Sequence, residues 1–382
     1  MILPLTAFIG SLFVLIYIYF LYLICIYLLC KLFPRLIQKG NRTPSVTILI
    51  AAFNEEKHIY ETIRNKLELD YPSGLFDIIV ISDSSTDRTD EIVLSFDNPR
   101  VKLLRQEPRG GKTSALNMAV LYAKGEIILF SDANSIYAND VINRIVKSFD
   151  DPDVGYITGK MVYSNPDGSI VGDGCSAYMK YENFLRKHET AVGSVVGVDG
   201  GIDAVRKNIY KPMRPDQLPD FILPLNVIKQ GYRVIYEPDA ILKEQTLQSF
   251  QDEYKMRVRV SLRSFWALKD MVHLFNPFKY GVFSWQIFSH KLLRYVAFIF
   301  MISLYISNIF LINYLSCFLF FFLGQNLFYM LSIAGYYGEK KGKNLMLFYI
   351  PYYFSLLNIA AGHAFLKFLK GEKQVIWTPR TG

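Results

Sequence analysis

Cysteine and histidine are scarce in this chain of 382 residues, which contains four cysteines and five histidines. Three of the cysteines lie in strongly apolar stretches, and Cys175 stands alone in the middle of the chain. No spacing among the cysteines suggests a zinc site or a disulfide framework, and the histidines are scattered. The sequence therefore predicts neither a cysteine or histidine metal centre nor a fold held by disulfides.

Excess charge is modest, with a formal net charge of +8. Much of the basic excess flanks apolar segments, at 31–42 and 340–343, which is typical of contact with anionic lipid headgroups. No basic patch is interleaved with aromatic residues as on surfaces that bind RNA or DNA. We therefore expect contact with a membrane and no nucleic-acid partner.

Charged side chains are missing from the first 30 residues. The apolar run from Leu3 to Phe33 exceeds the roughly 20 residues that span a bilayer. It lacks the basic start, short apolar core and small-residue cleavage site of a signal peptide. The run predicts an uncleaved anchor, and the basic residues after it place the following domain in the cytoplasm.

Long apolar runs return in the last quarter of the chain. Expected spans cover roughly 292–311 and 314–334, and a last apolar run at 345–366 contains Pro351. Four spans would place the tail outside, whereas its basic residues favour the inside. We expect a multi-pass protein of the plasma (inner) membrane, divided into an anchor at 1–42, a cytoplasmic domain at 43–270, an interfacial segment at 271–291, and membrane helices with a tail at 292–382.

The middle of the chain alternates apolar, strand-like stretches with helical patterns. Expected strands are 46–51, 77–82, 101–104, 126–131 and 154–163, with short strands around 233–236 and 240–243. Helical patterns follow the first three strands, and further helices are expected at 178–189, from Pro219 to Gly231 and at 249–270. The alternation predicts an α/β domain with a mainly parallel sheet and helices on both faces.

Polar residues follow several of these strands where each strand ends. The fourth strand runs into Asp132-Ala133-Asn134, the first into Asn54 and Glu55, and the second into Asp83. Ligands of open α/β sheets bind beyond the carboxyl ends of the strands. A carboxylate and an amide spaced i, i+2 can offer oxygens to a cation that holds a phosphate, although an Asx turn is the plain alternative. Polar ends on several strands favour a nucleotide site.

A phosphate-binding P-loop is absent despite the sequence Gly111-Lys112-Thr113. That motif needs a glycine five residues before Gly111, where Gln106 stands instead. A P-loop ATPase is therefore not expected. Backbone N–H groups at this helix start, together with Lys112, could still hold a diphosphate.

Together these motifs resemble the family 2 glycosyltransferases, specifically the membrane-embedded group of cellulose, chitin and hyaluronan synthases, over about Val46 to Trp266. The resemblance implies a GT-A fold and a nucleotide-sugar donor. The positions that match the family's base and ribose contacts are Ala52, Phe53, Asn54, Glu55 and Asp83. Those that match its diphosphate contacts are Arg109, Gly111 and Lys112.

Two further motifs carry over from the family with changes. Its metal motif Asp-x-Asp reads Asp132-Ala133-Asn134 here, so the resemblance implies Asp132 and Asn134 as ligands of Mg²⁺ or Mn²⁺. Its catalytic base is the Asp of Thr-Glu-Asp, and only Asp220 remains of that motif. The second carboxylate of the metal motif is therefore an amide in this chain.

The family's Gln-x-x-Arg-Trp stretch corresponds to 256–260. Arg257 and Arg259 are kept there and suit pyrophosphate binding, whereas the Gln and the Trp are missing. In processive synthases that Trp helps to form the acceptor site. Its absence leaves polymerisation and the acceptor open.

The resemblance implies an inverting transfer of a sugar from a nucleotide sugar, with a UDP-sugar favoured, to a lipid-linked or polysaccharide acceptor at the membrane. One alternative is a processive synthase that polymerises and exports glycan, alone or with an export partner, although four spans are few for a channel. Another is a non-catalytic subunit of a synthase complex, which the altered metal motif would suit. Retention of Asp132 and Asp220 argues against that subunit.

Overall fold

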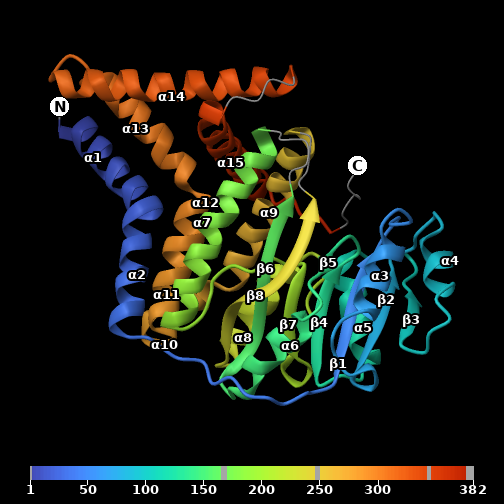
Figure 1. The fold of residues 1–382 in the computed structure, drawn as a ribbon. Helices are drawn as coiled ribbons and strands as arrows, with labels where there is room; N and C mark the ends of the chain where they lie inside the picture. Colours follow the sequence, from blue (N-terminus) through green and yellow to red (C-terminus); the bar gives the residue numbers. More distant parts are fainter. Residues whose placement is uncertain (1, 165–169, 246–249, 342–345, 376–382) are drawn as a thin grey trace.

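The computed structural model describes residues 2–164, 170–245, 250–341 and 346–375. An α/β domain stands beside a set of helices that come from both ends of the chain (Figure 1). Its eight strands have the spatial order β3-β2-β1-β4-β7-β6-β8-β5. They are β1 Val46–Ala52, β2 Phe76–Ser82, β3 Val101–Arg105, β4 Ile127–Asp132, β5 Ile136–Tyr137, β6 Val154–Ser164, β7 Ile202–Arg206 and β8 Arg233–Gln245.

Parallel pairing dominates the sheet. The pairs β3-β2, β2-β1, β1-β4 and β6-β8 are parallel, whereas β7 runs antiparallel to β4 and β6, and β5 runs antiparallel to β8. The predicted α/β class with a mainly parallel sheet is confirmed. The structure differs from the prediction in adding β5 and β7, and in joining the two short strands expected near 233–243 into one strand, β8.

β1 is buried along its whole length because helices cover both faces of the sheet. Alternate side chains of a strand point to opposite faces. Ile48 and Ile50 therefore pack with Ile59 of α3, whereas Leu49 packs with Leu116 of α5 on the other face. A strand covered on both faces reads as a continuous apolar run, which is why the sequence located it.

Seven helices accompany the strands within residues 43–270, counted over the described part of that range. They are α3 Ile59–Leu67, α4 Thr89–Leu94, α5 Lys112–Tyr122, α6 Val141–Val146, α7 Ile170–Val192, α8 Pro219–Lys229 and α9 Phe250–Asp270. The remaining helices are α1 Ile2–Ile16, α2 Tyr22–Leu32, α10 Pro277–Tyr280, α11 Val282–Gln286, α12 Leu293–Tyr295, α13 Ala297–Leu311, α14 Ser316–Lys340 and α15 Met346–Leu369.

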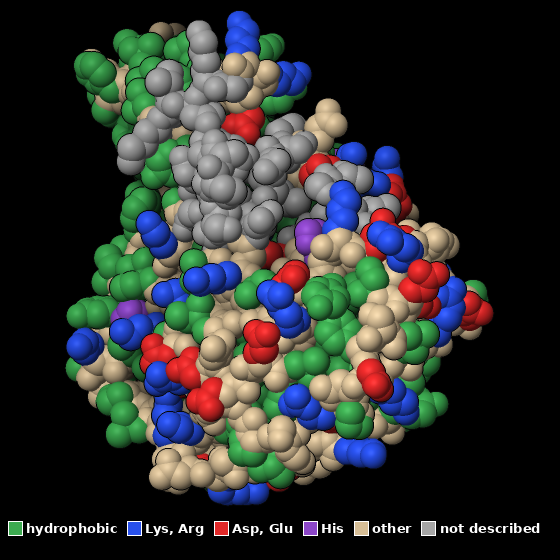
Figure 2. All heavy atoms as spheres, turned by 45° about the vertical axis from the view of Figure 1, so that its right-hand side comes forward, with side chains coloured by type: hydrophobic (Ala, Val, Ile, Leu, Met, Phe, Trp, Pro, Cys, Tyr) green, Lys and Arg blue, Asp and Glu red, His purple; other side chains and the backbone are tan. Residues whose placement is uncertain are grey.

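Two described helices are long and apolar enough to cross a membrane, Ile2–Leu32 and Ser316–Lys340. A third results if Val282–Tyr295 and Ala297–Leu311, which meet at a bend of 58°, count as one span. In Figure 1, α14 lies crosswise at the top of the molecule. Figure 2 shows mostly hydrophobic side chains in that upper part and charges of both signs over the domain below. These features support association with a membrane.

The last expected span behaves differently, because α15 packs against the α/β domain. Ala360 and Ala364 are fully buried in one cluster with Leu262 and Phe265 of α9. Small side chains let two helices approach closely. α15 is not among the candidate spans found in the described residues.

The chain after α15 returns to the α/β domain. The Trp266 indole N–H donates to the carbonyl oxygen of Glu372 at 2.8 Å, and Lys373 forms an ion pair with Asp216 at 2.5 Å. The carbonyl oxygen of Val375 lies 2.9 Å from where a Cβ on Gly111 would stand. Residues 372–375 therefore lie on the same side as the domain, a point the sequence left open.

Buried charges tie α7 to the segment before α13. Glu182 lies 3.2 Å from His290 and is also paired with Arg294 at 2.5 Å. Glu189 lies 2.7 Å from His290 and accepts a hydrogen bond from the Tyr22 hydroxyl at 2.6 Å. Removing one member of such a cluster would leave a buried charge without its partner. The cluster therefore fixes the apolar helices relative to the domain.

Candidate active site

Three charged side chains from distant parts of the chain converge at the carboxyl edge of the sheet. The Lys112 ammonium lies 2.8 Å from Asp132 and 3.5 Å from Asp220. Asp132 ends β4, Lys112 begins α5, and Asp220 lies in the first turn of α8. The sequence placed all three in one site, and the structure brings them together.

The electrostatics of this triplet suit proton transfer. Burial acts to lower the pKa of Lys112, but the charges of Asp132 and Asp220 raise it above its usual value. Burial raises the pKa of Asp220, helped by Asp132 and opposed by Lys112. A carboxylate whose pKa is raised above its ordinary value is a better general base than an ordinary surface carboxylate.

Gly200 determines the space available to Asp220. Its φ is 84°, and a Cβ built on it would stand 2.6 Å from the Asp220 carboxyl carbon. Glycine adopts this backbone conformation without strain and offers no side chain to collide. The glycine-rich bend at 197–201 therefore packs directly against the expected base.

Asp83 anchors the donor loop, which we define as residues 106–111. Its buried carboxylate accepts hydrogen bonds from the N–H groups of Gly110 at 2.8 Å and Gly111 at 3.0 Å, and from the Gln106 amide at 2.6 Å. The Arg109 guanidinium lies 3.5 Å away. Both carboxylate oxygens of Asp83 thus accept hydrogen bonds from the donor loop in this structure. The hydrogen bond expected between Asp83 and uracil stays a prediction.

A stacked pair forms beside this loop. The guanidinium carbon of Arg109 lies 3.3 Å from the ring centroid of Phe53, a cation–π arrangement. Asn54 has a φ of 54° and accepts from the Thr86 N–H at 2.8 Å. The predicted donor residues at the ends of β1 and β2 and the start of α5 are Ala52, Phe53, Asn54, Glu55, Asp83, Arg109, Gly111 and Lys112.

The proposed metal ligands offer one carboxylate and one amide. Among the described residues, no three or more histidine, cysteine or acidic side chains cluster in a way that could hold a metal ion. The Asn134 amide N–H donates to Glu244 at 3.1 Å. Mg²⁺ is commonly held by one or two carboxylates plus substrate phosphates. Asp132 and the Asn134 oxygen fit a cation that is carried largely by the donor's diphosphate.

Two side chains of α3 hold the loop that carries these ligands. Thr62 donates to the carbonyl oxygen of Ala133 at 2.7 Å, and the Lys66 ammonium donates to that of Ser135 at 2.5 Å. Burial lowers the pKa of Lys66 well below its usual value. Sequence reasoning did not single out Lys66, although its position four residues after Thr62 places both side chains on one helix face.

Residues 47–214 match the family model described as Glycosyl transferase family 2. This segment is a family 2 glycosyltransferase domain. The predicted family is confirmed, as is the enzyme class at the level of the domain.

Two curated relatives that are named for different products match parts of this chain. The chain is 32% identical over 180 residues to a beta-monoglucosyldiacylglycerol synthase of Nostoc sp., covering 46% of this chain and 38% of the relative. It is 25% identical over 253 residues to a poly-beta-1,6-N-acetyl-D-glucosamine synthase of Staphylococcus epidermidis, covering 62% and 61%. The chain thus spans less than two thirds of either relative.

One solved structure has a similar fold over nearly the whole chain. It is the mannosyltransferase PcManGT from Pyrobaculum calidifontis in complex with GDP-Man and Mn²⁺. The TM-score is 0.70 at 20% identity, and the match covers 97% of this chain and 98% of that one. The likeness includes the apolar helices as well as the glycosyltransferase domain.

Of the two arginines expected at the pyrophosphate, Arg257 lies towards α15 rather than towards Lys112. Arg257 forms an ion pair with Glu253 at 2.8 Å and donates to the Tyr353 hydroxyl at 2.7 Å. Arg259 is half-buried on the same helix. In this structure Arg257 therefore faces α15, and a role at the diphosphate stays a prediction for both.

Arg263, four residues after Arg259, lies behind the site of the glycosyltransferase domain instead. It donates to the carbonyl oxygen of Gln217 and to the Thr113 hydroxyl at 3.3 Å. Burial lowers its pKa to about 10, Asp220 opposes that shift, and Arg259 adds to it. Arg263 thus links α9 to the residue that follows Lys112. In the sequence, the i, i+4 spacing of Arg259 and Arg263 places both side chains on one face of the helix, and this spacing could have indicated the position of Arg263.

Asp203 of β7 is buried behind the same site, and the Gly200 N–H donates to it at 2.9 Å. Burial raises the pKa of Asp203 from 3.8 to about 7, and the charge of Asp220 adds to the shift. The folded protein thus holds this proton more tightly than the unfolded chain. The associated stability is present below pH ~4 and is lost as the pH rises towards ~7.

Asp203→Asn is expected to remove that pH dependence. Between pH 5 and pH 8 the wild type should lose on the order of 2–3 kcal/mol in unfolding free energy through this group, because one pKa unit corresponds to about 1.4 kcal/mol. Denaturant unfolding at both pH values measures the loss. The exposed carboxylate variant Asp140→Asn should keep the wild-type slope, and an equal slope in Asp203→Asn would contradict the assignment.

Proposed function

We propose that this chain is a membrane-bound, inverting glycosyltransferase that moves a sugar from a nucleotide sugar, with a UDP-sugar favoured, to a lipid-linked or polysaccharide acceptor. The observation that carries the proposal is the Lys112 ammonium between Asp132 and Asp220. The proposed metal ligand Asp132 and the proposed general base Asp220 thus lie on either side of one cation. Such an arrangement suits a site where a diphosphate leaves and a hydroxyl attacks.

The proposed reaction is a single displacement. The acceptor hydroxyl oxygen bonds to the anomeric carbon, the bond from that carbon to the diphosphate breaks, and the hydroxyl proton passes to Asp220. Lys112 exchanges its contact with Asp220 for a phosphate oxygen, which frees Asp220 to act as the base. A divalent cation held by Asp132 and Asn134 would offset the charge on the leaving diphosphate.

The relatives support the acceptor classes and widen the donor classes. One is named for making a glucosylated diacylglycerol and another for making a polysaccharide. The mannosyltransferase of similar fold was solved with GDP-Man and Mn²⁺, so guanosine donors belong in any test. In the proposed arrangement the domain at 43–270 lies on the cytoplasmic face of a multi-pass protein. An export or polymerisation partner would be needed if the product is a long glycan.

Nucleotide release tests the proposal. Purified full-length protein in detergent is given UDP-sugars and GDP-mannose with Mn²⁺ or Mg²⁺ and a membrane extract as the acceptor source. One donor should turn over, and Asp132→Ala should lower turnover by about 10²–10³-fold, the usual cost of removing one stabiliser of transition-state charge.

Asp140→Ala is the matched control and should retain activity, because among the described residues this half-exposed carboxylate forms an ion pair with Arg144 alone. Binding of a donor without turnover would favour the non-catalytic subunit. Failure to bind any nucleotide sugar would overturn the assignment of the site.

A further inference from the structure

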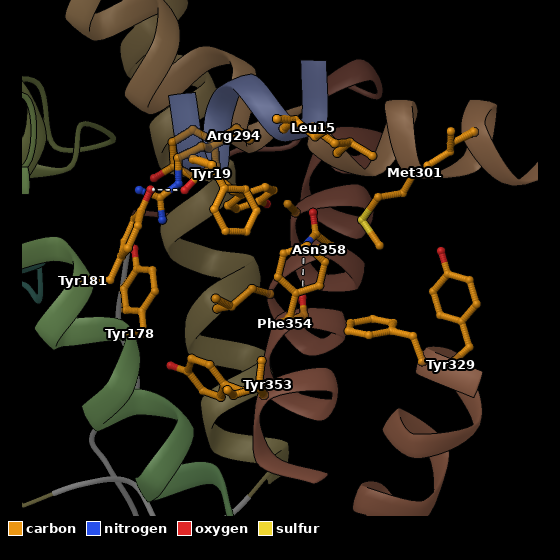
Figure 3. A pocket seen from close by; sticks show the side chains of 18 of the residues that line it. Leu15, Tyr19, Tyr178, Tyr181, Arg294, Met301, Tyr329, Tyr353, Phe354 and Asn358 are labelled. Atoms are coloured by element: carbon orange, nitrogen blue, oxygen red, sulfur yellow. Dashed lines mark hydrogen bonds between the residues drawn. The ribbon is translucent and has the colours of Figure 1, made fainter. Parts of the chain in front are cut away.

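A large cavity lies between the apolar helices and the glycosyltransferase domain. Its volume is about 1100 Å³, above the ~300–1,000 Å³ typical of small-molecule sites. Its lining is mostly apolar and comes from α1, α7, α9, α12, α13, α14 and α15 and from the short π-helical segments 17–21 and 287–292. In Figure 3, Tyr329 and Met301 lie on one side, and Tyr178, Tyr181 and Arg294 gather on the other.

Three cations line the cavity, and two of them are neutralised. Arg257 pairs with Glu253 at 2.8 Å, and Arg294 pairs with Glu182 at 2.5 Å. For the third, Lys291, no hydrogen bond or ion pair within 4 Å is found among the described residues, although its charge acts on the Glu182 carboxylate from farther away. A partly buried ammonium without a direct partner is costly in apolar surroundings. The cavity therefore offers one ammonium that no described carboxylate contacts directly.

Lys291 also connects the cavity to the catalytic residues. Its ammonium lies 5.8 Å from the ring centroid of Phe221, the residue after Asp220. It also stands 2.5 Å from where a Cβ on Gly197 would lie, in the glycine-rich bend that contains Gly200. The charged end of the cavity thus borders the expected base.

We propose that this cavity holds the apolar tail of an anionic acceptor lipid whose phosphate is bound by Lys291. A hydroxyl of the headgroup then faces Asp220. Lysine binds phosphate as a point charge, and an uncharged diacylglycerol would leave Lys291 without a direct counter-ion. Both candidate spans, through α1 and α14, line the cavity, so the tail can enter from the bilayer. The acceptor role rests on the proposed function, whereas the binding site can be tested alone.

Two pairs of variants test the site in purified full-length protein held in amphipol. Lys291→Met removes the charge, and Lys279→Met removes an exposed lysine outside the cavity. Gly324→Trp places a side chain in the cavity, whereas Gly10→Trp places one elsewhere on an apolar helix. Neither glycine has any atom within 4 Å of its Cβ position, so both changes should be tolerated.

The probes are hexadecyl phosphate and hexadecanol carrying the same fluorophore. The wild type should bind the phosphate at least ~10-fold more tightly than the alcohol, as expected for a contact to a charged group. Lys291→Met should reduce the preference to about 2-fold or less, and Gly324→Trp should weaken both probes. Lys279→Met and Gly10→Trp should match the wild type.

Three results would overturn the inference: equal binding of the two probes by the wild type, unchanged binding in Gly324→Trp, or displacement of hexadecyl phosphate by equimolar inorganic phosphate, which would indicate a plain anion site. Nucleotide-sugar binding, measured separately by calorimetry, keeps the two proposals apart. Loss of donor binding alone would contradict the proposed function and leave the lipid site standing.

Discussion

Asp220→Asn is expected to abolish sugar transfer while leaving donor binding nearly unchanged. The amide fills the same space but cannot accept the acceptor's proton, and a positioned general base typically contributes about 10²–10⁴-fold to the rate. Lys112 still has Asp132 at 2.8 Å as its counter-ion, so the cation that faces the donor keeps its place.

Single-turnover assays with a saturating donor separate the chemical step from binding. The rate constant should fall by at least about 10²-fold, whereas the donor Kd should change by less than about 3-fold. Asp140→Asn serves as the matched control. A variant that transfers sugar at the wild-type rate would show that another group takes the proton. A parallel loss of donor affinity would assign Asp220 to binding instead.

Gly200→Ala is expected to inactivate the protein through Asp220. The new methyl group would overlap the Asp220 carboxyl carbon at 2.6 Å, and the φ of 84° disfavours any side chain. Asp220 must turn away from Lys112 to relieve the contact. Because misplacement of a catalytic group by about 1 Å can cost around 10²-fold, turnover should fall by that factor or more.

Gly231→Ala separates backbone strain from displacement of the base. Gly231 has a φ of 91°, but nothing lies within 4 Å of its Cβ position. Both variants should lose about 1–2 kcal/mol of unfolding free energy from the left-handed backbone, and only Gly200→Ala should lose activity. Equal turnover in the two variants would refute the placement of Asp220 by Gly200.

The fold was predictable where burial leaves a plain trace in the sequence. β1, β2 and β4 are apolar runs covered on both faces, and their predicted limits lie within a residue of those observed. β7 was not predicted because the polar Asp203 interrupts its five residues, and β5 was not predicted because it has only two residues. Neither strand is long enough to show a period of two.

β8 was predicted as two short strands, whereas it is one strand whose pairing with β6 contains a bulge. Pro238 interrupts the apolar pattern, so the sequence reads as two short strands. The pairing with β6 shifts at this point, with Thr158 opposite Tyr236 and Lys160 opposite Ile241. Such a bulge accommodates the proline without ending the strand. The shift depends on the partner strand and is invisible in the local sequence.

The candidate site was predictable at its strand ends, where chemistry and position coincide. Asp132, Lys112 and Asp220 were expected together and lie together. Lys66 and Arg263 were not assigned to the site, because each reaches it from a helix whose sequence shows only an amphipathic pattern. Their contacts depend on how α3 and α9 pack, which follows from the assembled sheet rather than from local spacing.

The return of the chain to the domain after α15 has a practical consequence for handling the protein. Val375 lies against Gly111 of the donor loop. A fluorescent label attached at position 375 would therefore stand beside that loop. A label attached at the start of α1 would stand at the end of that helix which lies farthest from the sheet (Figure 1). The start of α1 is thus the attachment point that leaves the donor loop undisturbed.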